Sequence, residues 1–174
     1  MLTLVTGGAA SGKSEWAEHL IRQTSGKRFY IATMMPFGDE AEERIQKHRD
    51  RRAQDGYETL ECYTDLAGLK LPQRGSVLLD CLGNLVANEM FSPDAEQKNT
   101  QQAVLTGIRQ LTAQSENLIL VTNEVFSGGQ NYAGETLQYM KVLGALNCAA
   151  AAEADRVYEV VCGIPHCLKG RQQP

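Results

Sequence analysis

The sequence predicts an α/β fold in which a mostly parallel β-sheet is covered by helices on both faces. Apolar runs of strand length alternate with helical patterns along the 174 residues. The runs are continuously apolar, which is typical of parallel strands buried on both faces. A glycine-rich turn, GGAASGKS at 7–14, also joins the first apolar run directly to the first helical pattern. We find no internal repeat and no low-complexity linker, so we expect a single domain over 1–174.

The expected strands are short apolar runs bounded by turn residues or helical segments. They lie at 1–6, 28–33, 57–62, 76–81, 117–123 and 155–163. Segments with helical patterns occur between them, at 14–23, 39–53, 82–90, 100–114 and 135–152. The residues around 92–99 include Pro, Asp and Asn, which predict a loop. The C-terminal KGRQQP is expected to be a loose end.

The composition is that of an ordinary globular protein. Hydrophobic residues make up 43% of the chain and charged residues 22%, and the formal net charge is -4. This charge argues against a general nucleic-acid binder, which would usually be basic. The first residues lack a basic stretch followed by an apolar segment, and no apolar run approaches the roughly 20 residues of a membrane span. We expect a soluble, cytoplasmic protein.

The cysteines indicate neither a disulfide framework nor a zinc site. There are five of them, and no two form a C-x-x-C pair. A metal cluster of Cys162, His166 and Cys167 is disfavoured, because adjacent ligands diverge on a regular backbone and a fourth ligand is missing. We expect buried, reduced thiols.

The turn at 7–14 satisfies the phosphate-binding pattern G-x-x-x-x-G-K-[ST]. Glycines let the backbone wrap closely around an anion, and the following helix contributes its positive N-terminal end. Lys13 would reach the β- and γ-phosphates, and the hydroxyl of Ser14 would ligate Mg²⁺. The pattern predicts a P-loop NTPase-type fold that binds a nucleoside triphosphate. The candidate phosphate-binding residues are Gly7, Gly8, Ala9, Ala10, Ser11, Gly12, Lys13 and Ser14.

An acidic residue on the Mg²⁺ side is expected at the end of a neighbouring strand. Asp80, which ends SVLLD, is the first candidate. Glu124, which follows NLILVTN, is the second and could instead orient an acceptor hydroxyl. The alternative for each is a helix cap or an ordinary loop charge.

A histidine lies among arginines in the predicted helix at 39–53. Arg44, His48 and Arg52 are spaced i, i+4, i+8 and therefore share one face. The arginines, with Arg49 and Arg51 beside them, could hold phosphate bidentately and favour a neutral, nucleophilic imidazole. From the spacing alone, a catalytic histidine and a solvated helix are equally supported.

Six segments in order resemble one protein family: VTGGAASGKS, FYIAT, DEAEERIQKHRDRR, YETLE, VLLDC and VTNEV. The ending VYEVVCGIPHCLKG is similar to the final strand and tail of the same family. It is the adenosylcobinamide kinase/adenosylcobinamide-phosphate guanylyltransferase family of cobalamin biosynthesis. The combination of IAT with R-I-x-x-H-R is far more specific than the P-loop itself.

The resemblance implies a bifunctional enzyme. One activity passes a γ-phosphate to the hydroxyl of the aminopropanol arm of adenosylcobinamide. In the other, His48 attacks the α-phosphate of GTP, releases pyrophosphate and forms a GMP–histidine intermediate. GMP then passes to the new phosphate, giving adenosylcobinamide-GDP. The family's other nucleotide contacts fall on Ile31, Ala32, Thr33, Arg49, Asp50, Arg51, Arg52, Glu61 and Asp80.

The resemblance also implies partners and an assembly. GTP and a corrinoid are the substrates, ATP is an alternative donor in the kinase step, and family members form a propeller-shaped trimer. We interpret Glu61 as an acceptor for the N1–H and amino group of guanine, and Arg44 and Arg52 as ligands for the departing pyrophosphate.

The segment 126–148 departs from the family pattern. It retains Gly144 and Asn147 of a G-R-x-N-Q motif but has Ala145 and Cys148 at the other two positions, and the arginines common before it are missing. Tyr57 also stands where tryptophan is common, after one extra residue. These differences concern the acceptor and the subunit interface, and they leave the P-loop and His48 untouched.

Two other functions fit parts of the pattern. In a simple small-molecule kinase without a covalent step, His48 would be a solvated helix residue. A nucleotide-dependent switch would bind nucleotide without transferring any group to a corrinoid. The short chain leaves little room for an effector domain, which counts against the switch.

Overall fold

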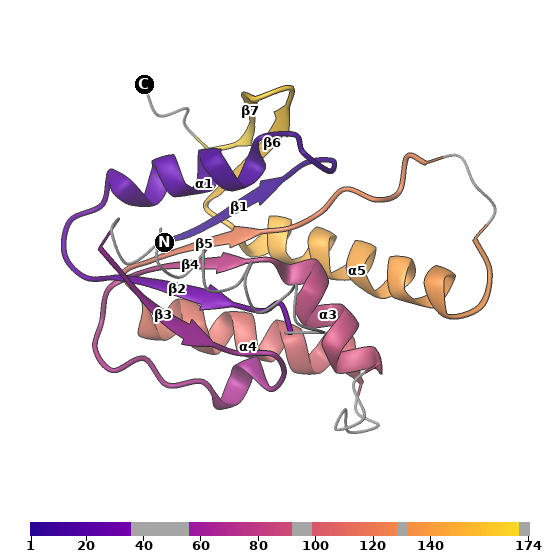
Figure 1. Ribbon diagram of the computed structural model, residues 1–174, viewed down its shortest axis with the longest axis horizontal. Helices are drawn as coiled ribbons and strands as arrows, with labels where there is room; N and C mark the ends of the chain where they lie inside the picture. The colour runs from indigo at the N-terminus through magenta and orange to yellow at the C-terminus, as the bar shows by residue number, and fades with distance from the viewer. Residues whose placement is uncertain (36–55, 92–98, 129–131, 171–174) are drawn as a thin grey trace.

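A seven-stranded β-sheet forms the centre of the computed structural model, with the strand order β3-β2-β4-β5-β1-β6-β7 (Figure 1). The structure describes residues 1–35, 56–91, 99–128 and 132–170. All neighbouring strands pair in parallel except β6 and β7, which are antiparallel. The strands are β1 (Leu2–Thr6), β2 (Arg28–Ala32), β3 (Tyr57–Glu61), β4 (Ser76–Asp80), β5 (Asn117–Val121), β6 (Arg156–Val161) and β7 (Ile164–Lys169).

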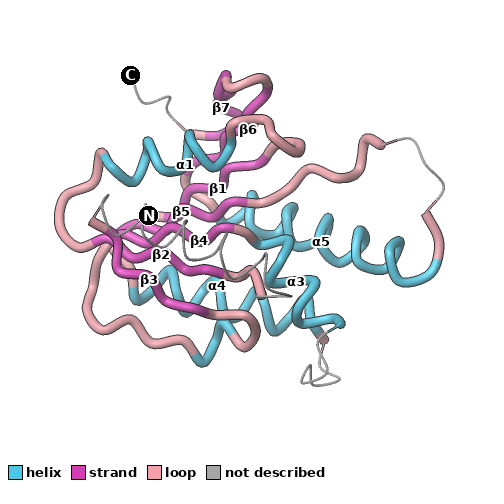
Figure 2. Tube along the Cα trace, viewed as in Figure 1, coloured by secondary structure: helices cyan, strands magenta, loops and turns pink. Residues whose placement is uncertain are grey.

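Helices cover both faces of the sheet, as Figure 2 shows. On one face lies α1 (Lys13–Arg22), which packs against β1, β4, β5 and β6. The other face carries α3 (Leu82–Phe91), α4 (Thr100–Gln114), α5 (Gly134–Glu153) and the short 3-10 helix η1 (Leu66–Gly68). This arrangement confirms the predicted mostly parallel α/β fold. The predicted helix at 39–53 and most of the predicted loop at 92–99 lie outside the described residues.

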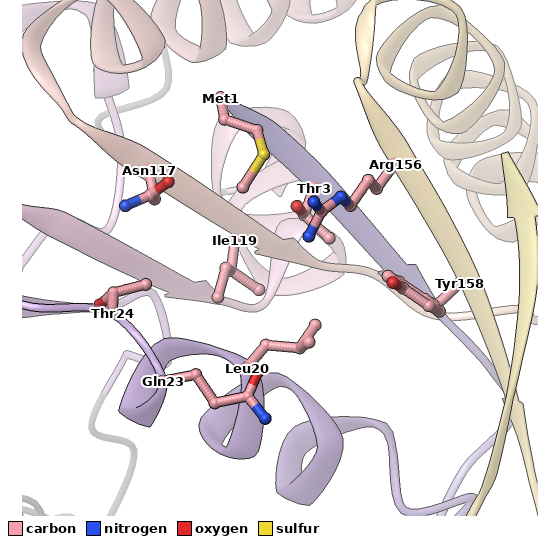
Figure 3. Close-up of a pocket in the computed structure, with 9 residues that line it drawn as sticks. All are labelled: Met1, Thr3, Leu20, Gln23, Thr24, Asn117, Ile119, Arg156 and Tyr158. Carbon is pink, nitrogen blue, oxygen red and sulfur yellow. The ribbon is translucent and has the colours of Figure 1, made fainter. Parts of the chain in front are cut away.

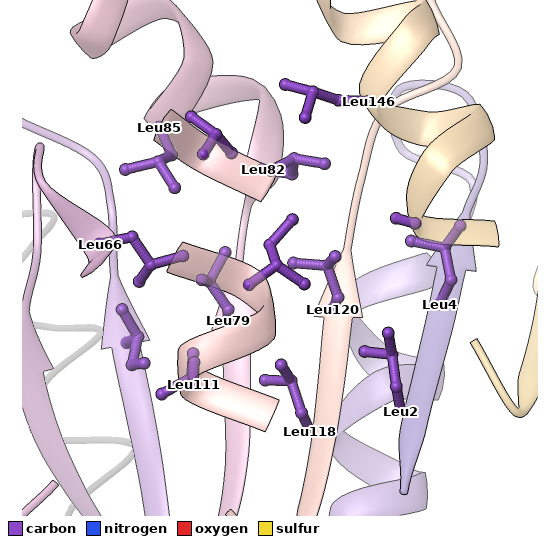
Figure 4. Close-up of a cluster of buried hydrophobic side chains, with 14 of the residues drawn as sticks. Leu2, Leu4, Leu66, Leu79, Leu82, Leu85, Leu111, Leu118, Leu120 and Leu146 are labelled. Atoms are coloured by element: carbon purple, nitrogen blue, oxygen red, sulfur yellow. The ribbon is translucent and has the colours of Figure 1, made fainter. Parts of the chain in front are cut away.

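Two hydrophobic clusters hold the layers together. The larger one lies between the sheet and α3, α4 and α5, and leucines from β1, β4 and β5 meet helix leucines in it (Figure 4). Leu79, Leu82, Leu85 and Leu120 are fully buried there. Each such side chain contributes about 1.5–3 kcal/mol on burial. The smaller cluster, under α1, includes Val5, Ala17 and Ile21 together with the rings of three tyrosines, Tyr30, Tyr57 and Tyr158.

The structure contains a strand that the sequence did not predict, just before the expected loose end at 169–174. Of that end, Lys169 belongs to the strand and residues 171–174 lie outside the described residues. Residues 164–169 form β7, an antiparallel edge strand on β6. The turn between them contains Cys162 and Gly163, with φ of 51° and 78°. Two residues with positive φ are typical of a tight hairpin, for which X-Gly is the sequence signal. Lys169 ends β7, and its Nζ donates hydrogen bonds to the carbonyls of Ala151 and Ala152 at the end of α5. That contact satisfies helix-end carbonyls that would otherwise have no partner in the helix.

Among the described residues, no helix is both long enough and apolar enough to cross a membrane.

Two helical glycines differ in how much space surrounds them, and this difference predicts opposite effects of alanine. A Cβ on Gly107 of α4 would lie 2.7 Å from Cβ of Leu66 in η1, whereas a Cβ on Gly144 of α5 would meet the ring of Phe126 at an ordinary 3.4 Å. Gly107→Ala should lower the free energy of unfolding by about 1–2 kcal/mol through overpacking. Gly144→Ala should raise it by about 0.5–1 kcal/mol because alanine favours helix. Urea denaturation measures both, and equal stabilisation by the two changes would contradict the tight α4–η1 contact.

Candidate active site

The glycine-rich loop leaves the end of β1 and turns directly into α1. Gly7 is the tightest point, because a Cβ there would lie 2.5 Å from Oγ of Ser11 and 2.6 Å from the carbonyl oxygen of Val160. Gly12, the residue before α1, has φ of 89°, a left-handed conformation that suits glycine. No other residue type fits both positions without moving the backbone. The loop therefore needs its glycines for its shape.

Contacts from three directions hold this loop. The backbone N–H of Glu124, just beyond β5, donates to the carbonyl of Gly7 at 3.0 Å. The N–H of Gly163, in the β6–β7 turn, donates to the carbonyl of Ser11 at 2.8 Å. From within the loop, Nζ of Lys13 donates to the carbonyl of Gly8 at 3.1 Å. The loop is thus fixed at its beginning and its middle by segments from elsewhere in the chain.

The start of α1 offers unsatisfied donors to a ligand. The N-cap residue is Gly12, which has no side chain with which to accept a bond from the first-turn N–H groups. By contrast, the N-cap residue of α4 is Asn99, whose side chain accepts a hydrogen bond from the N–H of Gln102. The hydroxyl Oγ of Ser11 is also buried without a partner among the described residues. Free first-turn N–H groups and the helix dipole favour an anion at this point.

The strand register brings three predicted residues to the same edge of the sheet. Ala32 at the end of β2 is paired with Glu61 of β3 on one side and with Asp80 of β4 on the other. Asp80 is in turn paired with Val121 of β5, which is paired with Val5 just before the loop. The carboxyl ends of five parallel strands therefore lie along one line with the glycine-rich loop.

The predicted position of the acidic residue needs a correction. Asp80 was expected on a neighbour of the P-loop strand, but β5 lies between β1 and β4. Glu124 follows the direct neighbour, β5, yet its Oε1 accepts hydrogen bonds from the N–H of Phe126 and the hydroxyl of Ser127. Glu124 therefore stabilises its own turn. Asp80 is half-buried, and its Oδ2 accepts a bond from the hydroxyl of Tyr30 at 3.2 Å.

The charges of Asp80 and Lys13 have opposite effects on the thiol of Cys81. Burial raises the pKa of Cys81, and the Asp80 carboxylate raises it further, whereas backbone hydrogen bonds at Asn84 and Gly83 and, to a smaller extent, the charge of Lys13 lower it. An ammonium affects a buried thiol only when it is close enough for the Coulomb interaction to survive screening.

The IAT segment, residues 31–33 at the end of β2, forms a buried support for this edge of the sheet. Ile31 and Thr33 are both fully buried. The hydroxyl of Thr33 donates to the carbonyl of Cys81 and accepts from the N–H of the same residue, both at 2.9 Å. The side-chain amide of Asn88 then ties the carbonyl of Thr33 to that of Tyr63. Of the predicted contact residues in this segment, only Ala32 is partly exposed at its side chain.

The last strand on this side presents Glu61 to solvent. Its Oε2 accepts a hydrogen bond from the hydroxyl of Tyr63 at 2.9 Å, which fixes the direction of the carboxylate. Tyr57, at the start of the same strand, is buried and meets the ring of Tyr30 edge-on, with centroids 6.2 Å apart. The tyrosine that replaces the family's common tryptophan is thus a core residue.

The predicted histidine helix at 39–53 lies outside the described residues. The candidate site residues in this helix are Arg44, His48, Arg49, Asp50, Arg51 and Arg52. The described chain stops at residue 35, just after β2, and resumes at residue 56, just before β3.

A polar network that the sequence did not reveal lies at the end of β5. The hydroxyl of Thr122 donates to Oδ1 of Asn147 at 2.7 Å, and Nδ2 of Asn147 donates to the carbonyl of Asn123. The amide of Asn123 contacts Sγ of Cys81 at 3.7 Å. Asn147 is one of the two residues that the divergent segment retains, and its spacing from Gly144 was the only signal for it.

The expectation about the thiols is partly wrong. All five cysteines are free, but only Cys62 and Cys81 are buried, whereas Cys148 and Cys162 are exposed and Cys167 is intermediate. Burial raises the pKa of Cys62 to about 11, with smaller contributions from Asp65 and Glu89. Cys162 is exposed because it occupies the tip of the unpredicted hairpin.

A small pocket lies away from these residues. It has a volume of about 50 Å³ and is lined by the residues labelled in Figure 3, among them Thr3, Arg156 and Tyr158. Asn117 and Met1 place it at the amino ends of β5 and β1, at the opposite end of the strands from the glycine-rich loop. It is therefore separate from the candidate site.

Comparison with known proteins identifies the family. A family model described as cobinamide kinase / cobinamide phosphate guanyltransferase matches residues 3–168. The bifunctional adenosylcobalamin biosynthesis protein CobU of Salmonella typhimurium is 35% identical over 178 aligned residues, covering 94% of this chain and 97% of that protein. The bifunctional adenosylcobalamin biosynthesis protein CobP of Pseudomonas aeruginosa is 32% identical, covering 98% of each.

Among solved structures, the P4 protein of bacteriophage phi6 in complex with ADP gives a TM-score of 0.43 at 15% identity, covering 94% of this chain and 52% of that one. This likeness is too low to bear on fold or function. The family match and the full-length relatives are decisive by themselves. The chain belongs to the cobinamide kinase / cobinamide phosphate guanyltransferase family.

Proposed function

We propose that this protein is a bifunctional enzyme of cobalamin biosynthesis. It phosphorylates the aminopropanol hydroxyl of adenosylcobinamide, and it transfers GMP from GTP to the resulting phosphate to give adenosylcobinamide-GDP. Family membership supports both reactions. The observation that carries the proposal is the joint placement of the glycine-rich loop, the uncapped start of α1 and Asp80 at one edge of the sheet.

The loop from Gly7 to Ser14 binds the phosphates of the nucleotide. Its N–H groups and the start of α1 favour an anion, and Lys13 adds a full positive charge. In the kinase step the acceptor hydroxyl oxygen attacks the γ-phosphorus, and the bond to the bridging oxygen of the nucleoside diphosphate breaks. Lys13 stabilises the charge that develops on the transferred group. GTP is the donor, with ATP as an alternative.

The residues around this step also fit a magnesium ion. Ser14 and Asp80 supply a hydroxyl and a carboxylate, which are the hard oxygen ligands that Mg²⁺ takes alongside substrate phosphates. When bound, the ion would neutralise charge on the phosphates. The hydrogen bond from Tyr30 holds one oxygen of Asp80 in a fixed direction.

The nucleotidyl half-reaction depends on His48. A ring nitrogen attacks the α-phosphorus of GTP, the α–β bridging P–O bond breaks, and pyrophosphate leaves. An oxygen of the corrinoid phosphate then attacks the same phosphorus and breaks the P–N bond, which regenerates the histidine. Covalent catalysis of this kind divides one difficult displacement into two easier ones. The resemblance of R-I-x-x-H-R to the family pattern supports this step. His48 itself lies outside the described residues.

Base recognition is assigned to the edge beside β3. The carboxylate of Glu61 accepts from the N1–H and amino group of guanine, and the bond from Tyr63 supports its orientation. The remaining proposed nucleotide contacts come from Ala32, Arg49, Asp50, Arg51 and Arg52. Ile31 and Thr33, expected from the resemblance as contacts, are fully buried and support this edge instead. We further propose that one domain over 1–174 performs both reactions in the cytoplasm, as a homotrimer.

His48→Ala should abolish covalent labelling by GTP. Wild-type protein incubated with Mg²⁺ and α-labelled GTP, then denatured, should retain acid-labile, base-stable label, as expected for a phosphoramidate. The variant should retain none, because no other nucleophile replaces the imidazole. The chain has only three histidines, so His19→Ala and His166→Ala are complete matched controls and should both keep the label. Label that survives in His48→Ala, or that is absent from wild type with nucleotide still bound, would rule out the covalent mechanism.

Asp80→Asn should lower the rate of phosphoryl transfer to adenosylcobinamide by about 10²–10³-fold, because a charged ligand of the metal is lost. The asparagine side chain retains the shape of aspartate and can still accept the hydrogen bond from the hydroxyl of Tyr30, so the fold should be unaffected. The transfer is measured with γ-labelled GTP at several Mg²⁺ concentrations. Glu124→Gln is the control and should transfer phosphate at nearly the wild-type rate. A larger loss of transfer rate in Glu124→Gln than in Asp80→Asn would assign the metal to Glu124.

A further inference from the structure

The turn between β6 and β7 is held in a backbone conformation that few residues adopt. Val161 and Ile164 are directly paired across the two strands, so only Cys162 and Gly163 form the turn. Both have positive φ, 51° at Cys162 and 78° at Gly163. At such angles glycine is unstrained, asparagine is tolerated and a β-branched residue is strongly disfavoured.

This turn packs directly on the middle of the glycine-rich loop (Figure 1). The N–H of Gly163 donates to the carbonyl of Ser11 at 2.8 Å. The two backbones approach so closely that a Cβ on Gly12 would lie 3.0 Å from Cα of Gly163. Two residues before the turn begins, the carbonyl oxygen of Val160 lies over Gly7, where a Cβ would be 2.6 Å away. The C-terminal hairpin thus covers the loop at two points.

The hydrogen bond to Ser11 also fixes the next N–H. The peptide unit between Ser11 and Gly12 is trans, as is every described peptide except Asp80–Cys81. In a planar trans unit the C=O and N–H point in opposite directions. Because the carbonyl of Ser11 points to the hairpin, the N–H of Gly12 points away from it.

We propose that Gly163 is a positioning residue for nucleotide binding: its N–H holds the Ser11–Gly12 peptide in the orientation that directs the N–H of Gly12 at a bound phosphate. The inference deepens the proposed function and rests on it. Gly163 acts on the loop through its hydrogen bond to Ser11, and its effect on the phosphate passes through the peptide that it orients. The hairpin is therefore part of the phosphate-binding apparatus, although it lies at the other end of the chain.

Substitutions at position 163 separate this role from a general effect on the fold. Gly163→Val should displace the turn and break the bond to Ser11, while Gly163→Asn should preserve the turn. Gly26→Val is the matched control, because Gly26 has a similar φ of 83° and its Cβ would meet nothing closer than 4.0 Å. It lies at the amino end of β2, away from the loop. Gly26→Val therefore imposes comparable backbone strain at a position that does not contact the glycine-rich loop.

The readouts are the thermal unfolding midpoint and the dissociation constants for GTP with Mg²⁺ and for inorganic pyrophosphate. The single tryptophan of the chain, Trp16, lies in the first turns of α1 and provides a fluorescence signal for binding. We expect Gly163→Val to weaken binding of both anions by about tenfold or more, the usual effect of losing an oriented hydrogen bond to a charged group. Gly163→Asn should stay within about threefold of wild type. Gly26→Val should lower the unfolding midpoint as Gly163→Val does, yet leave both dissociation constants unchanged.

A backbone ester gives the most direct test, because it removes the donor without adding a side chain. The natural Cys162 allows a synthetic peptide of residues 162–174 to be ligated to residues 1–161, with the 162–163 amide replaced by an ester. The all-amide ligated chain is the control. Weaker anion binding by the ester chain at an unchanged fold would support the role of the Gly163 N–H. Wild-type affinity in both the ester chain and Gly163→Val would overturn this inference alone, whereas failure of the unaltered protein to bind either anion would overturn the proposed function and the inference with it.

Discussion

The parallel pairing of β2, β4, β5 and β1 is the constraint on which the candidate site depends. In-register pairing aligns Ala32, Asp80, Val121 and Val5 across the sheet, so that the segments after these strands meet at one edge. A shift of one residue in any pair would turn the affected side chains to the opposite face. The buried leucines on one face and the tyrosines on the other fix this register, because each side of the sheet has its own core. Packing therefore sets the positions of the polar groups at the edge.

The glycine-rich loop is stabilised largely by backbone contacts from distant segments. The N–H groups of Glu124 and Gly163 bind its carbonyls, and the hairpin closes over Gly7 and Gly12. Such contacts use the carbonyls of the loop, and they leave the N–H groups of the first turn of α1 available to an anion. A preorganised set of donors does not have to reorganise when charge develops during phosphoryl transfer. Under the proposed function, the same loop serves two reactions that place charge on different phosphates of the nucleotide.

Much of the fold could be predicted from the sequence because its signals are local. The continuous apolar runs identified six of the seven strands, and helical periodicity identified α1, α3, α4 and α5 to within one or two residues. The strand β7 was missed because its residues alternate poorly and lie almost entirely at an exposed edge. The Cys-Gly turn was its signal, and it is recognisable only if a hairpin is already expected.

The sequence by itself determined the glycine-rich loop, the family and the chemical types of the candidate groups, because these depend on residue identity at fixed spacing along the chain. Only the tertiary structure decided which groups meet. In the structure, β5 lies between β1, which leads into the loop, and β4, which ends at Asp80. Glu124 accepts a hydrogen bond within its own turn, and the N–H of Gly163 donates to the carbonyl of Ser11. These outcomes depend on which faces can be buried together, and on backbone hydrogen bonds that carry no side-chain signature. The spacing of residues along the chain specifies the chemical groups of the candidate site, while long-range packing determines which of these groups lie next to each other.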